Sequence, residues 1–166
     1  TYLALAMGQT GNQNFGIVLM DGLNDENLEN RIAAIKSLGM IRFSPSASQL
    51  NKIAISNIDH QERLAAVISI GEIKDNSSKS FLISLLEDEE PNIRWDSAIS
   101  LIKMNDYTGS YILEKLLRRD YYINYSNIDE NEINNSMLTI LALVSQDPLN
   151  VFKDELMFLA EEEKNI

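Results

Sequence analysis

The chain has 166 residues, of which 45% are hydrophobic, with three prolines, seven glycines and no cysteine, and this balance is typical of an ordered globular chain. Its net charge of −11 at pH 7 repels phosphate backbones and anionic lipid headgroups, which speaks against nucleic acid and membrane surfaces as partners. The lack of cysteine excludes disulfides, thiolate nucleophiles and zinc or iron–sulfur sites built on cysteine in this stretch, and no compartment follows from these features.

The sequence repeats itself with a period of 31 to 32 residues. Three nine-residue segments align, and each begins with an arginine: residues 31–39, 63–71 and 94–102. Apolar residues recur at fixed distances from these arginines, eight residues before them at Leu23, Ile55 and Leu86 and ten residues after them at Ile41, Ile73 and Met104. A period of this length is typical of solenoids, in which each repeat packs only on its neighbours.

Taken in chain order, the repeats predict a series of helix pairs. A partial repeat over residues 1–13 is followed by complete repeats over about 14–44, 45–76, 77–106 and 107–147, and by a partial repeat over 148–166. In each complete repeat the apolar residues first mark a helix A and then a helix B, with helical spacing such as that of Ala34, Ile35 and Leu38. Polar caps and Pro91 lie in the breaks between A and B, where helices begin. We therefore expect an all-α solenoid of stacked antiparallel helix pairs, forming one domain over residues 1–166 that is a fragment of a longer solenoid.

The fourth repeat departs from this pattern. Asn134 takes the place of the arginine and lies 40 residues after Arg94, about eight more than the period. The additional residues fall within 118–130, which contain aromatic and turn-forming residues but no helical spacing of apolar ones. An inserted loop over residues 118–130 is predicted.

The pattern Asp-x5-Arg-x2-Ala-Ala-x2-Leu-Gly resembles the short HEAT repeat, also called the PBS-lyase HEAT-like repeat, over about residues 15–166. The resemblance implies stacked helix pairs and a polar ladder along the stack, in which an aspartate stands six residues before each arginine. The ladder positions in this chain are Asp25, Arg31, Asn57, Arg63, Asp88 and Arg94. Asn57 is expected to weaken one rung.

No catalytic, metal or cofactor site is predicted. One branch of the family, similar to deoxyhypusine hydroxylase, binds iron with His-Glu pairs, whereas the single histidine of this chain, His60, is followed by Gln61. The acidic runs at 87–90 and 161–163 lack the alternating Asp pattern of a calcium loop. We expect neither an enzymatic activity nor a cofactor in this chain.

The candidate binding residues lie on the B helices and in the insertion. Positions one and five after each arginine are expected to point outward on the concave side. Position one holds Ile32, Leu64 and Trp95, an apolar row that ends in tryptophan, and position five holds Lys36, Ile68 and Ile99. Exposed apolar rows with aromatic anchors are typical of protein interfaces, although packing between successive B helices is the alternative. We predict that Trp95 borders the partner site together with three tyrosines of the insertion, Tyr121, Tyr122 and Tyr125.

These features favour a scaffold or adaptor that binds another protein, and the acidic charge favours a basic partner. The hydrophobic ends of the array predict weak self-association. A regulatory or substrate-positioning domain of a larger enzyme is the main alternative, and a bilin lyase, suggested by the name of the repeat, is a third.

Overall fold

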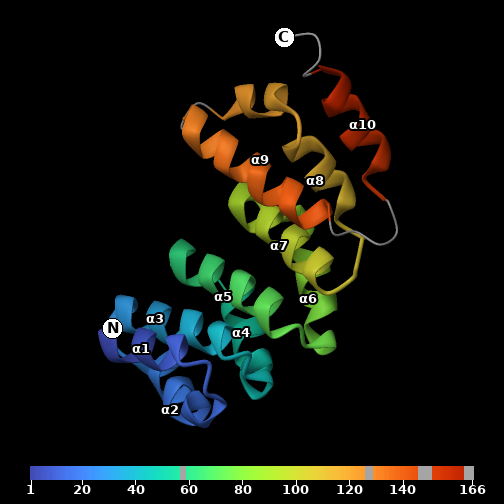
Figure 1. Cartoon of the computed structure of the whole chain (residues 1–166). Coiled ribbons are helices and arrows are strands. Elements are labelled where there is room, and N and C mark those ends of the chain that lie inside the picture. Colours follow the sequence, from blue (N-terminus) through green and yellow to red (C-terminus); the bar gives the residue numbers. More distant parts are fainter. Residues whose placement is uncertain (57–58, 126–128, 146–150, 163–166) are drawn as a thin grey trace. The chain divides into compact units, whose positions relative to one another are not determined.

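The computed structural model describes residues 1–56, 59–125, 129–145 and 151–162, and the regular elements among them are helices (Figure 1). The predicted all-α solenoid of helix pairs is therefore confirmed. The residues gather into two compact units, Thr1–Tyr107 and Thr108–Ile166, which we call unit 1 and unit 2. The single domain over residues 1–166 stays a prediction.

Unit 1 alternates short A helices with longer B helices. The B helices are α1 (Tyr2–Gln9), α3 (Leu28–Met40), α5 (His60–Ile73) and α7 (Pro91–Lys103). The A helices are α2 (Gly16–Asp21), α4 (Ala47–Ala54) and α6 (Lys79–Ser84), and short 3₁₀ turns adjoin them: η1 (Gln13–Phe15), η2 (Gly22–Asn24), η3 (Ser44–Ser46), η4 (Asn76–Ser78) and η5 (Leu85–Glu87). Each A helix packs on the B helix that follows it, and each B helix packs on the next B helix.

The starts of the B helices are set by side chains that satisfy their first backbone amides. The Asn27 side chain accepts hydrogen bonds from the amides of Glu29 and Asn30 at the start of α3, and the Asp59 side chain caps α5 in the same way. Pro91 is the first residue of α7, where its missing amide hydrogen costs nothing because the first turn has no acceptor for it. The local sequence thus determines where α3, α5 and α7 begin.

The core of unit 1 lies between the A and B layers. On α5, Ala66, Val67 and Ile70 are buried, and these are the positions three, four and seven after Arg63. The corresponding residues of α3 and α7 are buried as well: Ala34, Ile35, Leu38, Ser97, Ala98 and Leu101. The side chains that the repeat pattern predicts to face the core are therefore the ones that the structure buries.

Successive B helices come close together through a glycine of one helix and a serine of the next. The hydroxyl of Ser69 donates a hydrogen bond to the backbone carbonyl of Ile35, at 3.0 Å. A Cβ placed on Gly39 would lie 2.8 Å from the Cβ of Ser69, so the helices approach only because Gly39 has no side chain. In an α-helix the carbonyl of Ile35 also accepts the amide of Gly39, and the bare glycine leaves that carbonyl within reach of the serine. The same joint pairs Gly8 with Ser37, which donates to Ala4, and Gly71 with Ser100, which donates to Val67.

Unit 2 contains α8 (Ser110–Leu116), a 3₁₀ helix η6 (Arg119–Asn124), α9 (Glu130–Val144) and α10 (Lys153–Glu162). The sequence predicts an irregular loop over residues 118–130, but Arg119–Asn124 form a 3₁₀ helix because their aromatic side chains pack. Tyr122 is 3% exposed, and its hydroxyl donates to the backbone carbonyl of Leu116 at 2.8 Å. The hydroxyls of Tyr121 and Tyr125 lie 3.0 Å apart, and their rings are in contact. The 3₁₀ helix η6 therefore packs against the end of α8.

None of the helices in the described ranges combines the length and the apolar character that crossing a membrane requires.

Candidate functional site

The residues one and five positions after each arginine form a strip across α3, α5 and α7, which we call the B-face row. Successive side chains of a helix are about 100° apart, so these positions turn away from the core-facing ones. Ile68 is 40% exposed and Lys36 is exposed, while the other members are partly buried: Ile32, Leu64, Trp95 and Ile99. The row thus lies at the boundary between the B-helix contacts and the solvent.

An ion pair lies on the same layer of B helices. The ammonium group of Lys103 on α7 is 2.5 Å from a carboxylate oxygen of Glu72 on α5, and both residues stand nine positions after their arginine. Asp96 on α7 is partly buried, and desolvation raises its pKa to about 6, while the positive charge of Lys103 acts in the opposite direction. The corresponding positions of α3 and α5 hold Ala33 and Ala65, so the third repeat has a carboxyl group where the others have a methyl group.

Replacing Asp96 with Asn should make unit 1 more stable at neutral pH. Because the folded pKa of about 6 lies above the ordinary value, the protonated acid is favoured by folding, and its contribution is present at low pH and lost as pH rises through 6. We expect Asp96→Asn to raise the free energy of unfolding at pH 7.5 by about 1–3 kcal/mol and to have little effect at pH 3.5. Urea titrations at the two values, with exposed Asp21→Asn as the control, would measure this; equal effects at both pH values would contradict it.

The arginine ladder joins neighbouring repeats. Arg31 donates two hydrogen bonds to the carboxylate of Glu62 in the next repeat, at 2.9 and 3.0 Å, and one each to the backbone carbonyls of Asp25 and Glu26. Glu62 is only 2% exposed. The sequence did not single out Glu62, because its partner lies 31 residues away on another helix.

Further along the ladder, Arg63 donates to the carboxylate of Asp88 in the next repeat and to the carbonyl of Ala54. Arg94 donates to the carbonyls of Asp88 and Glu89. Asn57 lies outside the described residues. Arg63 and Asp88 thus bridge two repeats, whereas within their own repeats Arg31 and Arg94 donate to backbone carbonyls. The ladder arginines fix the turns between A and B helices.

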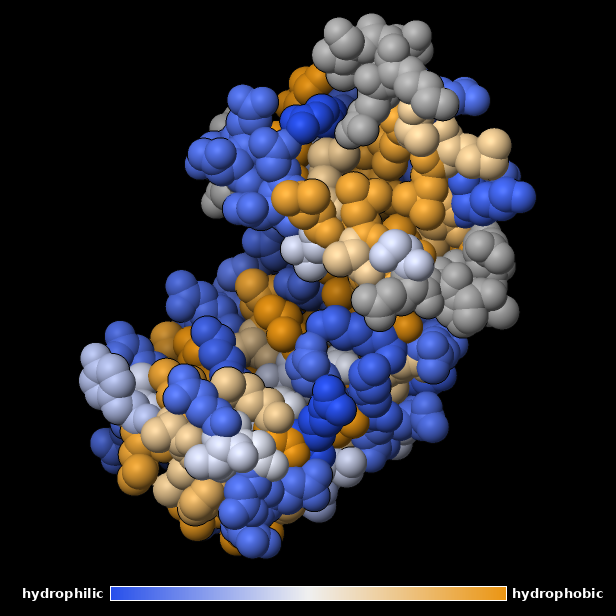
Figure 2. Space-filling model, viewed as in Figure 1, coloured by the Kyte–Doolittle hydropathy of each residue, from blue (hydrophilic) through white to orange (hydrophobic). Residues whose placement is uncertain are grey.

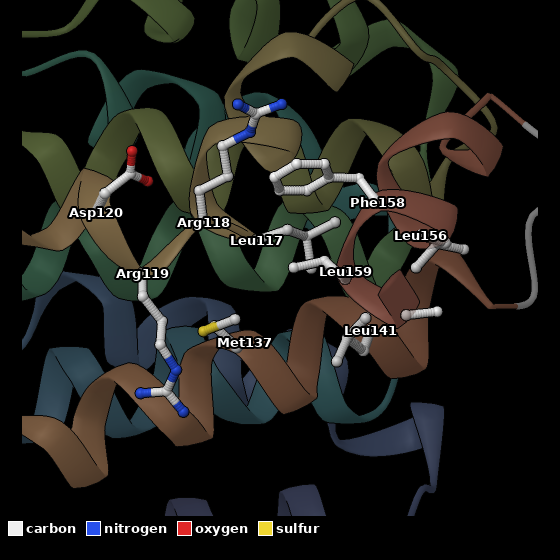
Figure 3. A pocket seen from close by; sticks show the side chains of 10 residues that line it. Leu117, Arg118, Arg119, Asp120, Met137, Leu141, Leu156, Phe158 and Leu159 are labelled. Atoms are coloured by element: carbon white, nitrogen blue, oxygen red, sulfur yellow. The ribbon is translucent and has the colours of Figure 1, made fainter. Parts of the chain in front are cut away.

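A groove in unit 2, with a volume of about 640 Å³, was not predicted from the sequence (Figure 3). Its apolar lining comes from the end of α8, from α9 and from α10: Leu117, Met137, Leu141, Leu156, Phe158 and Leu159. Hydrophobic side chains also gather on the exposed surface of these helices (Figure 2). Phe158 is 42% exposed.

Two consecutive arginines beside this groove form hydrogen bonds with α10 and α9. Arg118 donates two hydrogen bonds to the carboxylate of Glu155 on α10, at 2.8 and 3.0 Å, and its guanidinium lies over the ring of Phe158. Arg119 donates to the side-chain oxygen of Asn134 on α9 at 2.6 Å. In Figure 3 the side chains of Arg119 and Asp120 point away from each other. The groove is therefore mainly apolar, and its charged lining residues are Arg118, Arg119 and Asp120.

The predicted tyrosine cluster needs one correction. Tyr122 is buried and hydrogen-bonded to Leu116, so its side chain stabilises unit 2 and does not face a partner. Tyr121 and Tyr125 are partly exposed. Trp95 belongs to unit 1 and the tyrosines to unit 2, and their predicted proximity stays a prediction.

His60 lies at the start of α5 beside a polar cavity of about 580 Å³, whose lining includes Arg63, Asp88, Glu89 and Glu90. The carboxylate of Asp88 is bound to Arg63. Within the described ranges, histidine and acidic side chains do not form a cluster of three that could hold a metal ion. The described arrangement offers contact surfaces and an apolar groove.

Comparison with known proteins agrees with this architecture. Residues 48–124 match the family model of HEAT repeats, and over these residues the match confirms the resemblance seen in the repeats. A search of the curated proteins finds no match.

Proposed function

Taking the chain as a solenoid that carries HEAT repeats, we propose that it is a protein-interaction scaffold and that the B-face row contacts the partner. HEAT repeats generally serve as protein-interaction scaffolds, because stacking helix pairs produces an extended surface. The observation that supports this site is the exposure of Ile68 in the middle of the row, with Leu64 partly exposed one turn before it. A partly exposed apolar row over several helices is a typical contact surface.

The charge of the chain supports a basic partner. With 25 acidic and 14 basic residues, the protein attracts positively charged surfaces at long range and speeds their association. Several basic side chains of unit 1 are already bound to carboxylates, among them Arg31, Arg63 and Lys103. The remaining acidic side chains therefore determine the electrostatic field that acts on an approaching partner.

Replacing Ile68 with Asp should abolish partner binding without unfolding the chain. Substituting an apolar contact residue at an interface costs about 2 kcal/mol or more when it is an anchor, which corresponds to at least a tenfold loss of binding. The partner would first be identified by affinity capture with the wild-type chain, and its dissociation constant would then be measured for each variant. Ile68 suits this test better than Trp95, because Trp95 is partly buried and its replacement mixes packing with binding.

The control is Ile83→Asp on the A helix α6, since Ile83 is 39% exposed and Ile68 is 40% exposed. Both variants should keep their thermal stability nearly unchanged, as is usual for exposed positions. If Ile68→Asp still binds the partner with wild-type affinity, or if Ile83→Asp loses it equally, the B-face row is not the contact surface.

A further inference from the structure

The interface between α5 and α7 differs from the other B-helix interfaces in the residue two positions after the arginine. At this position α3 has Ala33 and α5 has Ala65, which are 2% and 3% exposed. The same position of α7 holds Asp96. Because two of the three helices carry only a methyl group there, the packing of the B helices does not itself require an acidic side chain.

Asp96 lies on the side of α7 that faces α5. Ser100, four residues later, donates a hydrogen bond to the backbone carbonyl of Val67 on α5 at 3.1 Å, and the ammonium group of Lys103, seven residues later, binds the carboxylate of Glu72 on α5. Residues four and seven positions apart lie on the same side of an α-helix. The carboxyl group of Asp96 is therefore directed at the interface, where it is partly buried.

The cations near this interface are engaged with other groups. Within unit 1, α7 packs on α5, α6 and η5, and the titratable side chains of these elements and of α7 itself, apart from Asp96, are His60, Glu62, Arg63, Glu72, Lys79, Glu87, Arg94 and Lys103. Arg63 is bound to Asp88, and the ammonium group of Lys79 lies 3.9 Å from the carboxylate of Asp106. Arg94 donates to backbone carbonyls.

The fourth of these cations, Lys103, acts on Asp96 from a distance. Its positive charge favours the ionised carboxylate, but its ammonium group is bound to Glu72. Within the described ranges, no hydrogen-bond donor is bound to the Asp96 carboxyl group. Desolvation therefore dominates, and it raises the pKa of Asp96 from the ordinary value of 3.8 to about 6.

The charge of Asp96 is thus linked to how tightly α7 packs on α5. If the interface loosens and water reaches the carboxyl group, its pKa returns towards the ordinary value, so the ionised form favours the loosened arrangement and the protonated form favours the packed one. With a pKa of about 6 in the packed arrangement and 3.8 in the loosened one, the equilibrium constant for loosening should rise about tenfold between pH 5.0 and pH 7.5.

The start of α7 is attached differently from the start of α5. Arg31 binds the carboxylate of Glu62 in the first turn of α5. Ile93 occupies the equivalent position of α7, and Arg63 instead binds Asp88 in the turn before α7. The polar contacts of α7 with α5 described above lie in the second half of α7, so we expect loosening in the first half, which contains Asp96.

We propose that ionisation of Asp96 loosens the packing of the first half of α7 on α5 and that protonation restores it, so that pH regulates this interface. The B-face row crosses the interface, with Ile68 on α5 and Ile99 on α7, and its continuity changes with the packing. The inference concerns the packing within unit 1 and does not require the function proposed for the row.

Distances between two spin labels, measured by double electron–electron resonance, test the proposal. The chain has no cysteine, so Gln61→Cys and Asn92→Cys, both at exposed second residues of their helices, would carry labels across the α5–α7 interface. At pH 7.5 we expect a longer distance component, whose ratio to the shorter one falls about tenfold at pH 5.0. Glu29→Cys with Gln61→Cys is the control pair across the α3–α5 interface, and its distances should not change with pH.

Identical distances at the two pH values for the first pair, equal changes in both pairs, or a longer component that grows towards pH 5.0 would overturn the proposal. In the labelled chain, Asp96→Asn should keep the shorter distance at both pH values, because the amide has no charge. Asp96→Ala, which introduces the residue of the other two interfaces, should do the same, whereas exposed Asp21→Asn should keep the pH dependence. An unchanged pH dependence in the Asp96 variants would assign the effect to another group and overturn the role of Asp96.

The carboxyl group can also be followed directly in the unlabelled chain. The ¹³C NMR signal of the Asp96 carboxyl carbon should titrate with a midpoint of about 6, and backbone amide signals at the start of α7 should shift with the same midpoint. A midpoint near the ordinary value of 3.8 would overturn the proposal.

Discussion

Ala66→Asp should unfold unit 1 under conditions in which the wild-type chain is folded. Ala66 lies on α5 with no exposed surface, so the substitution would place a carboxylate in the core between α4 and α5 without a partner. Burying an unpaired charge costs far more than a surface substitution, and we expect a loss of about 3–5 kcal/mol, a large part of the stability of a small domain. Urea denaturation followed by far-ultraviolet circular dichroism would measure it.

Ile68→Asp is the control, because it introduces the same side chain on the same helix, two positions away, where the side chain is exposed. Its effect should stay below about 1 kcal/mol. Equal losses for the two variants would show that the helical register of α5 is wrong.

Arg31→Met should be the most damaging change in the ladder. It removes both hydrogen bonds to Glu62 and leaves that carboxylate buried without a positive charge. Breaking a buried pair by removing one partner typically costs about 3–5 kcal/mol, and we expect about 2–4 kcal/mol here because Arg31 is partly exposed and water can reach the site. Arg94→Met is the matched control: Arg94 donates to two backbone carbonyls, and its loss should cost about 1 kcal/mol.

The second half of this experiment is the double variant Arg31→Met with Glu62→Leu. Replacing both charges with apolar side chains should restore most of the stability lost by Arg31→Met alone, since no buried charge is left unpaired. If the double variant is as unstable as the single one, the loss comes from the arginine's contacts with the Asp25 and Glu26 carbonyls.

The fold could be predicted from the sequence because a solenoid repeats its local pattern. The spacing of Ala34, Ile35 and Leu38 indicates one face of a helix, and its recurrence after Arg63 and Arg94 shows that each repeat has the same core. The helix starts at Asn27, Asp59 and Pro91 follow from local capping chemistry. These signals act over a few residues, and so the sequence alone contains them.

The contacts between repeats could not be predicted in the same way. Arg31 was assigned to the ladder, but its partner Glu62 occupies a position that holds Asn30 in the preceding repeat and Ile93 in the following one, so no repeated pattern marks it. The position of Tyr122 in an insertion predicts a binding residue, yet its ring is buried and its hydroxyl donates to the carbonyl of Leu116. The groove of unit 2 combines side chains from α8, α9 and α10, whose arrangement depends on packing that an individual sequence does not show.

The glycine–serine contact between successive B helices determines which repeats of the array can be deleted or duplicated. A repeat that has a serine six positions after its arginine and a glycine eight positions after it can pack on a B helix at either side. The repeat over residues 45–76 has both, in Ser69 and Gly71. Deleting that repeat would bring Gly39 against Ser100, and duplicating it would bring Gly71 against a second Ser69. Both altered chains would therefore keep a glycine–serine contact between successive B helices. The next repeat, over residues 77–106, has Ser100 but Ile102 at the glycine position, and the isoleucine side chain would block an approaching serine. Repeats can therefore be deleted or duplicated with this contact kept only up to α7.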